Sequence, residues 1–256
     1  MKILTLTTDW NSHDYYVGIV KGYVISNSPE TKIIEITHSI PIFDTRKACF
    51  TVISCYNHFP KNTIHVIGVR GFKNRDSAPP IAAKYNNHWF FGYENSAFLD
   101  MFDKKENVEI WALNVLETSF PEFELLIKPA IKLSNGELIE SLGKKIDNQT
   151  FPTSISPQKS DSNLVGIVTY INSYGNAITN ITKANFEACQ QGRAFKITLI
   201  KRQNSINKIC SSFNEEEGEL VAIFNSLGLL ELGQMNYRLD QSIGLDIESK
   251  IRIQFL

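Results

Sequence analysis

The segment Thr7–Gly18 (TTDWNSHDYYVG) follows a short apolar run and carries residue types that can bind a small molecule. Asp9 stands where the run ends. A carboxylate there can accept two hydrogen bonds from a vicinal diol, such as the 2′ and 3′ hydroxyls of a ribose. Asp9 can equally cap the helix that follows, although Asp14 is the better cap because it directly precedes the helical pattern. Spacing alone leaves the two roles of Asp9 open.

Other polar residues also follow apolar runs or lie in turns. The basic loop 70–76 (RGFKNRD) places Arg70 and Arg75 where they could meet an anion or simply face water. His38 is a lone histidine, and such residues are more often structural than catalytic. Asn176 lies in a Tyr-Gly-Asn turn. Its amide can read a purine edge, because it offers both a donor and an acceptor, or it can bond its own backbone.

Hydrophobic periodicity indicates which elements position these residues. Apolar runs predict strands at 1–7, 33–36 and 63–69, and one-sided apolar spacing predicts helices between them. This β-α-β-α-β order predicts an α/β N-terminal domain with a largely parallel sheet covered by helices. Ligands of such sheets bind beyond the carboxyl ends of the strands, which is where the polar sites of the first half of the chain fall.

The pattern changes in the second half of the chain. Residues 152–163 are polar, and we expect them to link a domain spanning 1–151 to a second domain spanning 164–256. In this second domain, short apolar runs alternate with turn residues and long helical patterns are absent. That pattern predicts an all-β C-terminal antiparallel barrel.

Composition excludes several classes of function. The chain has 256 residues and a formal net charge of -1, so neither nucleic acid nor a membrane is an expected partner. Its four cysteines form no CxxC pair and are expected to be reduced thiols. The histidines have no metal-ligand spacing, and no P-loop or GxSxG motif occurs. We therefore expect no metal and no cofactor. A signal peptide and an 18-residue apolar run are also absent, which predicts a cytoplasmic location.

Four segments together resemble one known family. The segments are TTDWNSHDYYVGIVKG (7–22), EITHSIPIFD (35–44), GIVTYINSYGNAITNI (166–181) and EEEGELVAIFNSLGLLELG (215–233). They are similar, in the same order, to motifs of the S-adenosylmethionine hydroxide adenosyltransferases, the family that also contains the fluorinating and chlorinating enzymes. One such match would be weak, but four in order identify the chain as a divergent member.

The resemblance implies a fold, an assembly and a ligand. The fold is an α/β domain followed by a β-barrel domain, as periodicity also predicts. The assembly is a homotrimer, with the adenosyl ligand between one subunit's N-terminal domain and its neighbour's C-terminal domain. By position, Asp9 holds the ribose hydroxyls, Phe43 packs near the sulfonium, Asn176 reads the adenine with Tyr174 nearby, and Ser226 contacts the methionine end. The implied reaction converts S-adenosylmethionine and water to adenosine and methionine.

The chain departs from the family at the residues that carry the chemistry. Arg70 stands where the family's hydrolases have a water-activating aspartate, and Pro121 stands where they have a histidine. Asn172 replaces an aspartate that the resemblance places against the methionine ammonium. Arg75 alone could stand in for an arginine further along the family loop.

These departures change what the site can do. Displacement at C5′ of an adenosyl sulfonium needs neither a metal nor a general acid, because the leaving group is a neutral thioether; it needs an oriented nucleophile in a dry pocket. Arg70 cannot be a base at neutral pH. At about 5 Å it would repel the sulfonium by roughly 3 kcal/mol at an effective dielectric near 20. A neutral amide at Asn172 removes a further charge-assisted bond of about 1.5–3 kcal/mol.

Two hypotheses of different classes follow. The first is a hydrolase with a rearranged site, in which the catalytic candidates are Glu94, Glu122, Arg75 and, at the family's aspartate position, Arg70. The second is a catalytically silent nucleoside-binding protein that keeps only the adenosine pocket. Adenosyl transfer to an anion held by Arg70 is a weaker third reading, because the halogenating members use hydroxyl and backbone donors there. The family favours the first hypothesis, and the local residues favour the second.

Overall fold

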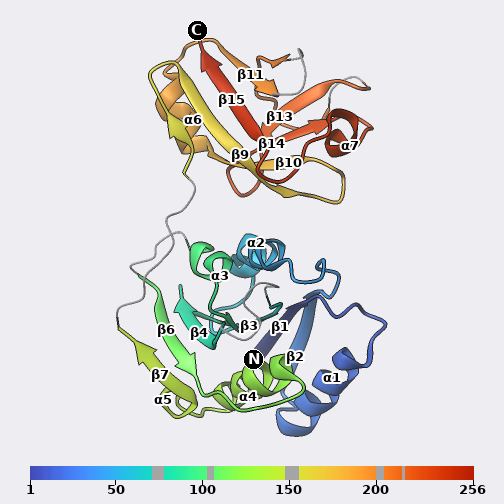
Figure 1. Ribbon diagram of the computed structural model, residues 1–256, viewed down its shortest axis with the longest axis vertical. Coiled ribbons are helices and arrows are strands. Elements are labelled where there is room, and N and C mark those ends of the chain that lie inside the picture. The colour runs from blue at the N-terminus through green and yellow to red at the C-terminus, as the bar shows by residue number, and fades with distance from the viewer. Residues whose placement is uncertain (71–77, 103–106, 148–155, 200–204, 215–216) are drawn as a thin grey trace. The chain divides into compact units, whose positions relative to one another are not determined.

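The computed structural model describes residues 1–70, 78–102, 107–147, 156–199, 205–214 and 217–256. The chain forms two compact units, Met1–Thr153 and Ser154–Leu256 (Figure 1). Gln158–Lys159, within the expected linker, forms the short strand β8 and pairs with β9. Backbone pairing at an exposed edge needs no apolar side chains, so the polar composition of this segment did not reveal it.

The first unit is built on a seven-stranded sheet in the order β2-β1-β3-β5-β4-β6-β7. The strands are β1 (Lys2–Thr8), β2 (Thr31–Thr37), β3 (Ile64–Gly68), β4 (Pro80–Tyr85), β5 (His88–Tyr93), β6 (Glu109–Leu113) and β7 (Gly143–Ile146). Pairings among β2, β1, β3 and β5 are parallel, and the remaining pairings are antiparallel. The expected α/β class is confirmed, and the sheet is mixed.

Helices cover both faces of this sheet. They are α1 (Tyr15–Asn27), α2 (Thr45–Cys55), η1 (Tyr56–His58), α3 (Ser96–Asp100), the π-helix η4 (Glu122–Ile127), α4 (Lys128–Ser134) and α5 (Ile139–Leu142). Figure 1 shows α1 and α4 on one face and α2 and α3 on the other. Side-chain caps begin several of them, because the first N–H groups of a helix lack partners within it. Asp44, for example, accepts from Lys47 N at 2.9 Å.

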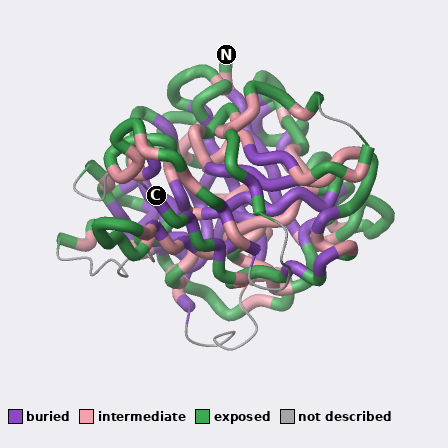
Figure 2. The backbone as a smooth tube through the Cα atoms, turned by 90° about the horizontal axis from the view of Figure 1, so that it is seen from above, coloured by how far each residue is buried: buried purple, intermediate pink, exposed green. Residues whose placement is uncertain are grey.

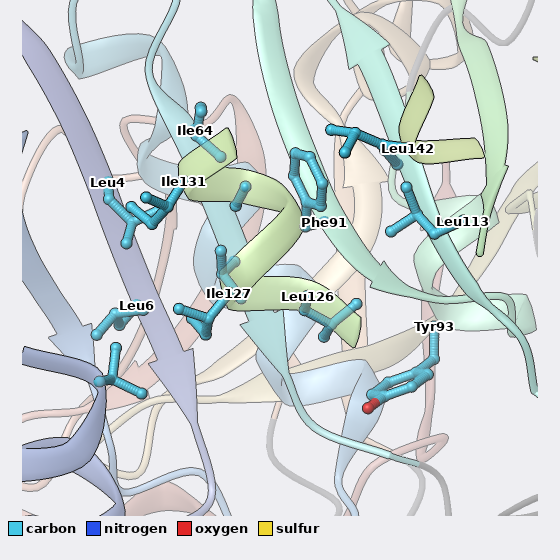
Figure 3. Close-up of a cluster of buried hydrophobic side chains, with 14 of the residues drawn as sticks. Leu4, Leu6, Ile64, Phe91, Tyr93, Leu113, Leu126, Ile127, Ile131 and Leu142 are labelled. Atoms are coloured by element: carbon cyan, nitrogen blue, oxygen red, sulfur yellow. The ribbon is translucent and has the colours of Figure 1, made fainter. Parts of the chain in front are cut away.

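Each face of the sheet has its own apolar core. Adjacent residues of β3 point to opposite sides, so Val66 belongs to one core cluster and Ile67 to the other. Figure 3 shows Leu4 and Phe91 of the sheet around Ile127 and Ile131 of the covering helices. Because the central strands β3, β4 and β5 are buried on both faces, they read as largely apolar runs in the sequence.

The second unit is an antiparallel sheet in the order β12-β11-β15-β9-β10-β14-β13, with β8 beside β9. Its strands are β9 (Asn163–Ile171), β10 (Ala177–Thr182), β11 (Phe195–Leu199), β12 (Ser205–Ile206), β13 (Leu220–Phe224), β14 (Leu229–Gln234) and β15 (Lys250–Phe255), and its helices are α6 (Lys183–Gln190) and α7 (Leu239–Ile243). A bridge between Cys210 and Ile223 brings the two ends of the sheet together. The result is the expected antiparallel, nearly closed barrel.

Burial in the barrel follows strand alternation. In β15, Ile251, Ile253 and Phe255 are buried while the residues between them are exposed. Figure 2 shows the same division along the whole described backbone, with buried segments inside and exposed segments outside. No helix among the described residues is both long enough and apolar enough to cross a membrane.

Candidate functional site

A cavity of about 760 Å³ lies in the first unit, lined by the segments that follow β1, β2 and β3 and by the start of η4. Small-molecule sites have volumes of about 300–1,000 Å³. Its lining includes two residues expected to bind the ligand, Asp9 and Phe43, and two catalytic candidates, Arg70 and Glu122. The structure therefore brings together, from four separate segments, two expected ligand-binding residues and two catalytic candidates.

Asp9 follows β1 and holds the loop that follows β2. Its Oδ2 accepts a hydrogen bond from the backbone N–H of Phe43 at 3.0 Å, and Phe43 has a left-handed φ of 67°. The cap of α1 is Asp14, whose carboxylate accepts from the N–H of Tyr15 at 2.7 Å. Asp9 is therefore not the helix cap that spacing left open. Its carboxylate lies in the cavity wall instead.

The loops after β1 and β2 are also tied to each other through His38. The N–H of Asn11 donates to the His38 carbonyl at 2.8 Å, and His38 Nδ1 lies 2.7 Å from the hydroxyl oxygen of Thr8. The His38 side chain is buried, and burial lowers its pKa, so the ring is neutral at neutral pH. His38 therefore connects the two loops through its carbonyl and its ring, which is a structural role of the kind that a lone histidine most often has.

Three aromatic rings form one wall of the cavity. Ring centroids are 5.9 Å apart for Trp10 and Tyr16, 5.4 Å for Trp10 and Phe120, and 4.9 Å for Tyr16 and Phe120. The Trp10 ring also lies parallel to that of His38, at 6.3 Å and 8°. An aromatic wall of this kind suits either a flat ring or a cation.

Arg70, Tyr93 and Glu122 form a connected polar group at the border of the core. The Arg70 guanidinium lies 4.8 Å from the centroid of the Tyr93 ring, and the Tyr93 hydroxyl donates to Glu122 Oε1 at 3.4 Å. Burial raises the pKa of Tyr93, and the nearby Glu122 carboxylate adds to this effect. Burial also raises the pKa of Glu122, while Arg70 and the Tyr93 hydroxyl partly oppose that increase. Figure 3 shows the Tyr93 hydroxyl at the edge of the apolar cluster.

The π-helix η4 places Glu122 in this group. In η4 the N–H of Lys128 donates to the carbonyl of Phe123, five residues back, which is the wide turn of a π-helix. The next residue, Pro129, has no N–H to bond the carbonyl four residues before it, so the regular series of α-helical hydrogen bonds is interrupted at this point. Such turns occur frequently at functional sites.

Gly68, at the end of β3, lets the surrounding side chains approach. A Cβ added there would lie 3.2 Å from Thr8 Cγ2, 3.5 Å from a ring carbon of Trp10 and 3.7 Å from Glu122 Cγ. The absence of a side chain therefore allows the β1 loop and the start of η4 to meet across the end of β3.

The described lining of the cavity includes two of the four catalytic candidates, Arg70 and Glu122. Glu94 follows β5 and donates its N–H to the carbonyl of Pro79 at 2.9 Å, and the described lining does not include it. Arg75 falls outside the described residues. Pro121, at the family's histidine position, does line the cavity but carries no titratable group.

The other expected binding residues lie in the second unit, around a buried carboxylate. Glu231 is 7% exposed, and its Oε1 accepts from the side-chain amides of Asn172 and Asn176, each at 3.0 Å. Its Oε2 accepts from the amide of Asn225 at 3.0 Å. Two further residues expected to contact the ligand, Tyr174 and Ser226, are exposed on turns beside this cluster.

Sequence reasoning did not identify Tyr93 or Glu231 as parts of these groups. Tyr93 ends an apolar strand and looks like a core residue in the sequence. Glu231 left a clearer signal, because it is a charged residue between two leucines of a buried strand. A charge at such a position needs buried hydrogen-bond partners. No group of three or more His, Cys, Asp and Glu residues in the described ranges could hold a metal ion.

Comparison with known proteins connects both units to one family. Residues 4–143 match the model described as the SAM hydroxide adenosyltransferase N-terminal domain, and residues 166–252 match that of the C-terminal domain. The chain is 22% identical to the (R)-S-adenosyl-L-methionine hydrolase of Methanocaldococcus jannaschii, with 99% of this chain and 96% of the relative covered. It is 21% identical to the protein of the same name from Thermus thermophilus, covering 99% and 100%.

Solved structures show the same fold. An uncharacterized conserved protein from Thermotoga maritima superposes with a TM-score of 0.84 at 20% identity, covering 99% of this chain and 100% of the other. A conserved hypothetical protein from Thermus thermophilus superposes with a TM-score of 0.78 at 20% identity, covering 100% of both chains.

Proposed function

Because the chain belongs to the SAM hydroxide adenosyltransferase family, we propose that it hydrolyses S-adenosylmethionine to adenosine and methionine, with Glu122 as the group that activates water. The observation that carries this proposal is the place of Glu122, in the same cavity as Asp9 and with a pKa raised by burial. A carboxylate of raised pKa is a stronger general base when ionised. The Asp9 carboxylate holds the ribose hydroxyls, and Phe43 packs near the sulfonium.

The reaction needs few groups. A water molecule attacks C5′ of the adenosyl group, the new C–O bond forms, and the C–S bond breaks with its electron pair going to sulfur. The Glu122 carboxylate takes the proton that the water loses. Methionine leaves as a neutral thioether, so its departure requires no proton donor. The chain therefore has to supply orientation, one base and exclusion of bulk water.

The charges of the cavity support a cationic substrate. The described lining holds the carboxylates of Asp9, Asp14 and Glu122 and a single guanidinium, that of Arg70. Arg70 lies over Tyr93 and interacts electrostatically with Glu122. Its repulsion of the sulfonium, which the sequence suggested, is therefore offset by a carboxylate that the sequence did not place beside it. The aromatic wall adds cation–π attraction of about 0.5–2 kcal/mol.

A catalytically silent nucleoside-binding protein is the second candidate. It is favoured by Arg70, which occupies the family's aspartate position in the cavity and cannot serve as a base. It is also favoured by Asn172, which offers a neutral amide where the family has a carboxylate.

Incubation of the purified chain with S-adenosylmethionine, followed by chromatography for adenosine and methionine, separates the two candidates. The hydrolase produces both at equal rates, Asp9→Ala weakens binding, and Glu122→Gln abolishes turnover while adenosine still binds. Glu124→Gln is the matched control, because Glu124 lies on the same helix and pairs with Lys128 at 2.7 Å. Adenosine binding without turnover above the Asp9→Ala background would establish the silent binder instead.

A further inference from the structure

We infer that Glu231 is a positioning residue that fixes the side-chain amide of Asn176 with its oxygen toward the ligand, and so makes the site choose a 6-aminopurine over a 6-oxopurine. The inference rests on the proposed adenosine site and concerns how that site selects its base. It starts from the three asparagine amides that donate to the one buried carboxylate in β14.

Backbone N–H groups fix the orientation of two of the three amides. Asn172 Oδ1 accepts from the N–H groups of Tyr174 and Asn176, each at 3.0 Å. Asn225 Oδ1 accepts from those of Leu227 and Leu229, at 3.0 and 3.2 Å. Their NH₂ groups therefore have to face Glu231, because turning either amide would set donor against donor.

Asn176 has no such anchor. Its Nδ2 donates to Glu231 Oε1 at 3.0 Å, and within the described part of the chain its Oδ1 accepts no hydrogen bond. Glu231 can only accept when ionised, so it holds the amide nitrogen inward and leaves the oxygen for a ligand. Gly233 leaves room for this orientation, since a Cβ added there would lie 2.7 Å from Asn176 Oδ1.

This orientation selects between purines. An amide that presents an oxygen and one N–H matches the 6-amino group and N7 of adenine, whereas a 6-oxo group would set oxygen against oxygen. A well-placed bidentate contact of this kind discriminates by about tenfold or more. The buried carboxylate therefore acts on specificity without touching the ligand.

Glu231→Gln combined with Asn172→Asp tests this mechanism, because a glutamine has one acceptor and one donor end. The fixed NH₂ of Asn225 donates to the new carbonyl, and the new carboxylate at position 172 accepts from the new NH₂. That NH₂ also faces Asn176, whose amide can turn. The Asn176 oxygen then faces inward and its donor faces the ligand, which favours inosine over adenosine.

The experiment measures binding of adenosine and of inosine to the full chain by calorimetry. The wild type is expected to prefer adenosine by about tenfold or more, and Glu231→Gln with Asn172→Asp to lower that ratio by about tenfold. The matched double variant Glu231→Gln with Asn225→Asp keeps the preference, because a carboxylate at position 225 accepts from the new NH₂ and leaves the glutamine oxygen facing Asn176. Glu219→Gln, an exposed change in the same unit, leaves the ratio unchanged.

An unchanged ratio in a folded Glu231→Gln/Asn172→Asp chain, or the same ratio in both double variants, would overturn the inference. If the Asn172→Asp double variant does not fold, the Asn225→Asp double variant decides: a ratio near one refutes the inference and a wild-type ratio supports it. A wild-type chain that binds neither nucleoside refutes the proposed function itself and removes the basis of the inference.

Discussion

The hydroxyl of Tyr93 donates to Glu122 Oε1 at 3.4 Å, which connects the end of β5 to the start of the π-helix at the cavity wall. This contact joins a residue that the sequence marked as a catalytic candidate to one that looked like core. It also lowers the pKa of Glu122 against the effect of burial, because a hydrogen bond to a carboxylate favours its charged form.

Tyr93→Phe is therefore expected to shift the pH dependence of turnover. Activity rises with pH as Glu122 loses its proton, and the hydroxyl of Tyr93 lowers the pKa of Glu122 against the effect of burial. Removing the hydroxyl raises that pKa, so the acid limb of the rate profile moves to higher pH. The ring remains, so Arg70 keeps its stacking partner. A pH–rate profile of kcat for both proteins measures the shift, with Tyr85→Phe at the end of β4 as control. An acid limb that stays in place would remove Tyr93 from the mechanism.

Arg70→Met is expected to change the affinity for S-adenosylmethionine more than the affinity for adenosine. The guanidinium repels a sulfonium but not neutral adenosine, so its removal strengthens binding of S-adenosylmethionine. The upper limit of this gain in affinity is about one hundredfold. It corresponds to a charge–charge repulsion of roughly 3 kcal/mol at an effective dielectric constant near 20. Calorimetry with both ligands measures the difference, using Glu122→Gln chains so that no turnover intervenes. Equal changes for the two ligands would mean that Arg70 contributes shape rather than charge.

A buried histidine pair predicts loss of stability in mild acid. His65 Nδ1 lies 2.8 Å from the hydroxyl of Thr5, and His65 Nε2 lies 3.2 Å from His88 Nδ1. Burial and the neighbouring His88 lower the pKa of His65 to about 3. Burial and the Lys61 charge lower the pKa of His88 to about 4.

The sign follows from linkage. Both folded-state pKa values lie below the usual value of about 6.5, so the unfolded chain binds more protons between that pH and the folded values. The free energy of unfolding is greatest above pH 6.5 and falls below it, by up to about 1.4 kcal/mol per pH unit for each histidine. Urea unfolding at pH 7 and pH 5 should show the fall. This loss of stability should be smaller in His88→Gln. It should be as large as in the wild type in His58→Gln, which replaces an exposed histidine. An equal loss in all three proteins would mean that other groups cause it.

The fold could be predicted largely from local patterns. Apolar runs and helical spacing gave the α/β and barrel classes, because each buried strand and each covering helix has its own periodicity. The antiparallel half of the first sheet also has a local signal in Asn86-Asn87, which takes φ of 49° and 63° in the turn between β4 and β5. That signal shows why a sheet that begins as parallel strands becomes mixed.

The site could be predicted only in part. Asp9 was placed correctly at a strand's carboxyl end, but the contact among Arg70, Tyr93 and Glu122 joins the segment after β3, the end of β5 and the start of η4. Their separations in the chain carry no information about that contact. The three partners of Glu231 likewise come from two turns far apart in the sequence. Spacing in the sequence identifies residues that follow strands, whereas the packing of the folded chain determines which of these residues come into contact.

Complementation between inactive chains is expected if the ligand lies between subunits. Asp9 belongs to the first unit and Asn176 to the second, and we propose that a homotrimer builds each site from one of each. Asp9→Ala and Asn176→Ala chains are each inactive in this arrangement. Mixed in equal amounts and reassembled, they form intact pairings at about one quarter of the sites, because each site draws its two parts independently.

Light scattering measures the assembly, and adenosine release measures the recovery. A trimer with no recovered activity would mean that each site draws both parts from one chain. Activity in a control sample that contains only one of the two variants, reassembled in the same way, would show that its substitution does not inactivate the site.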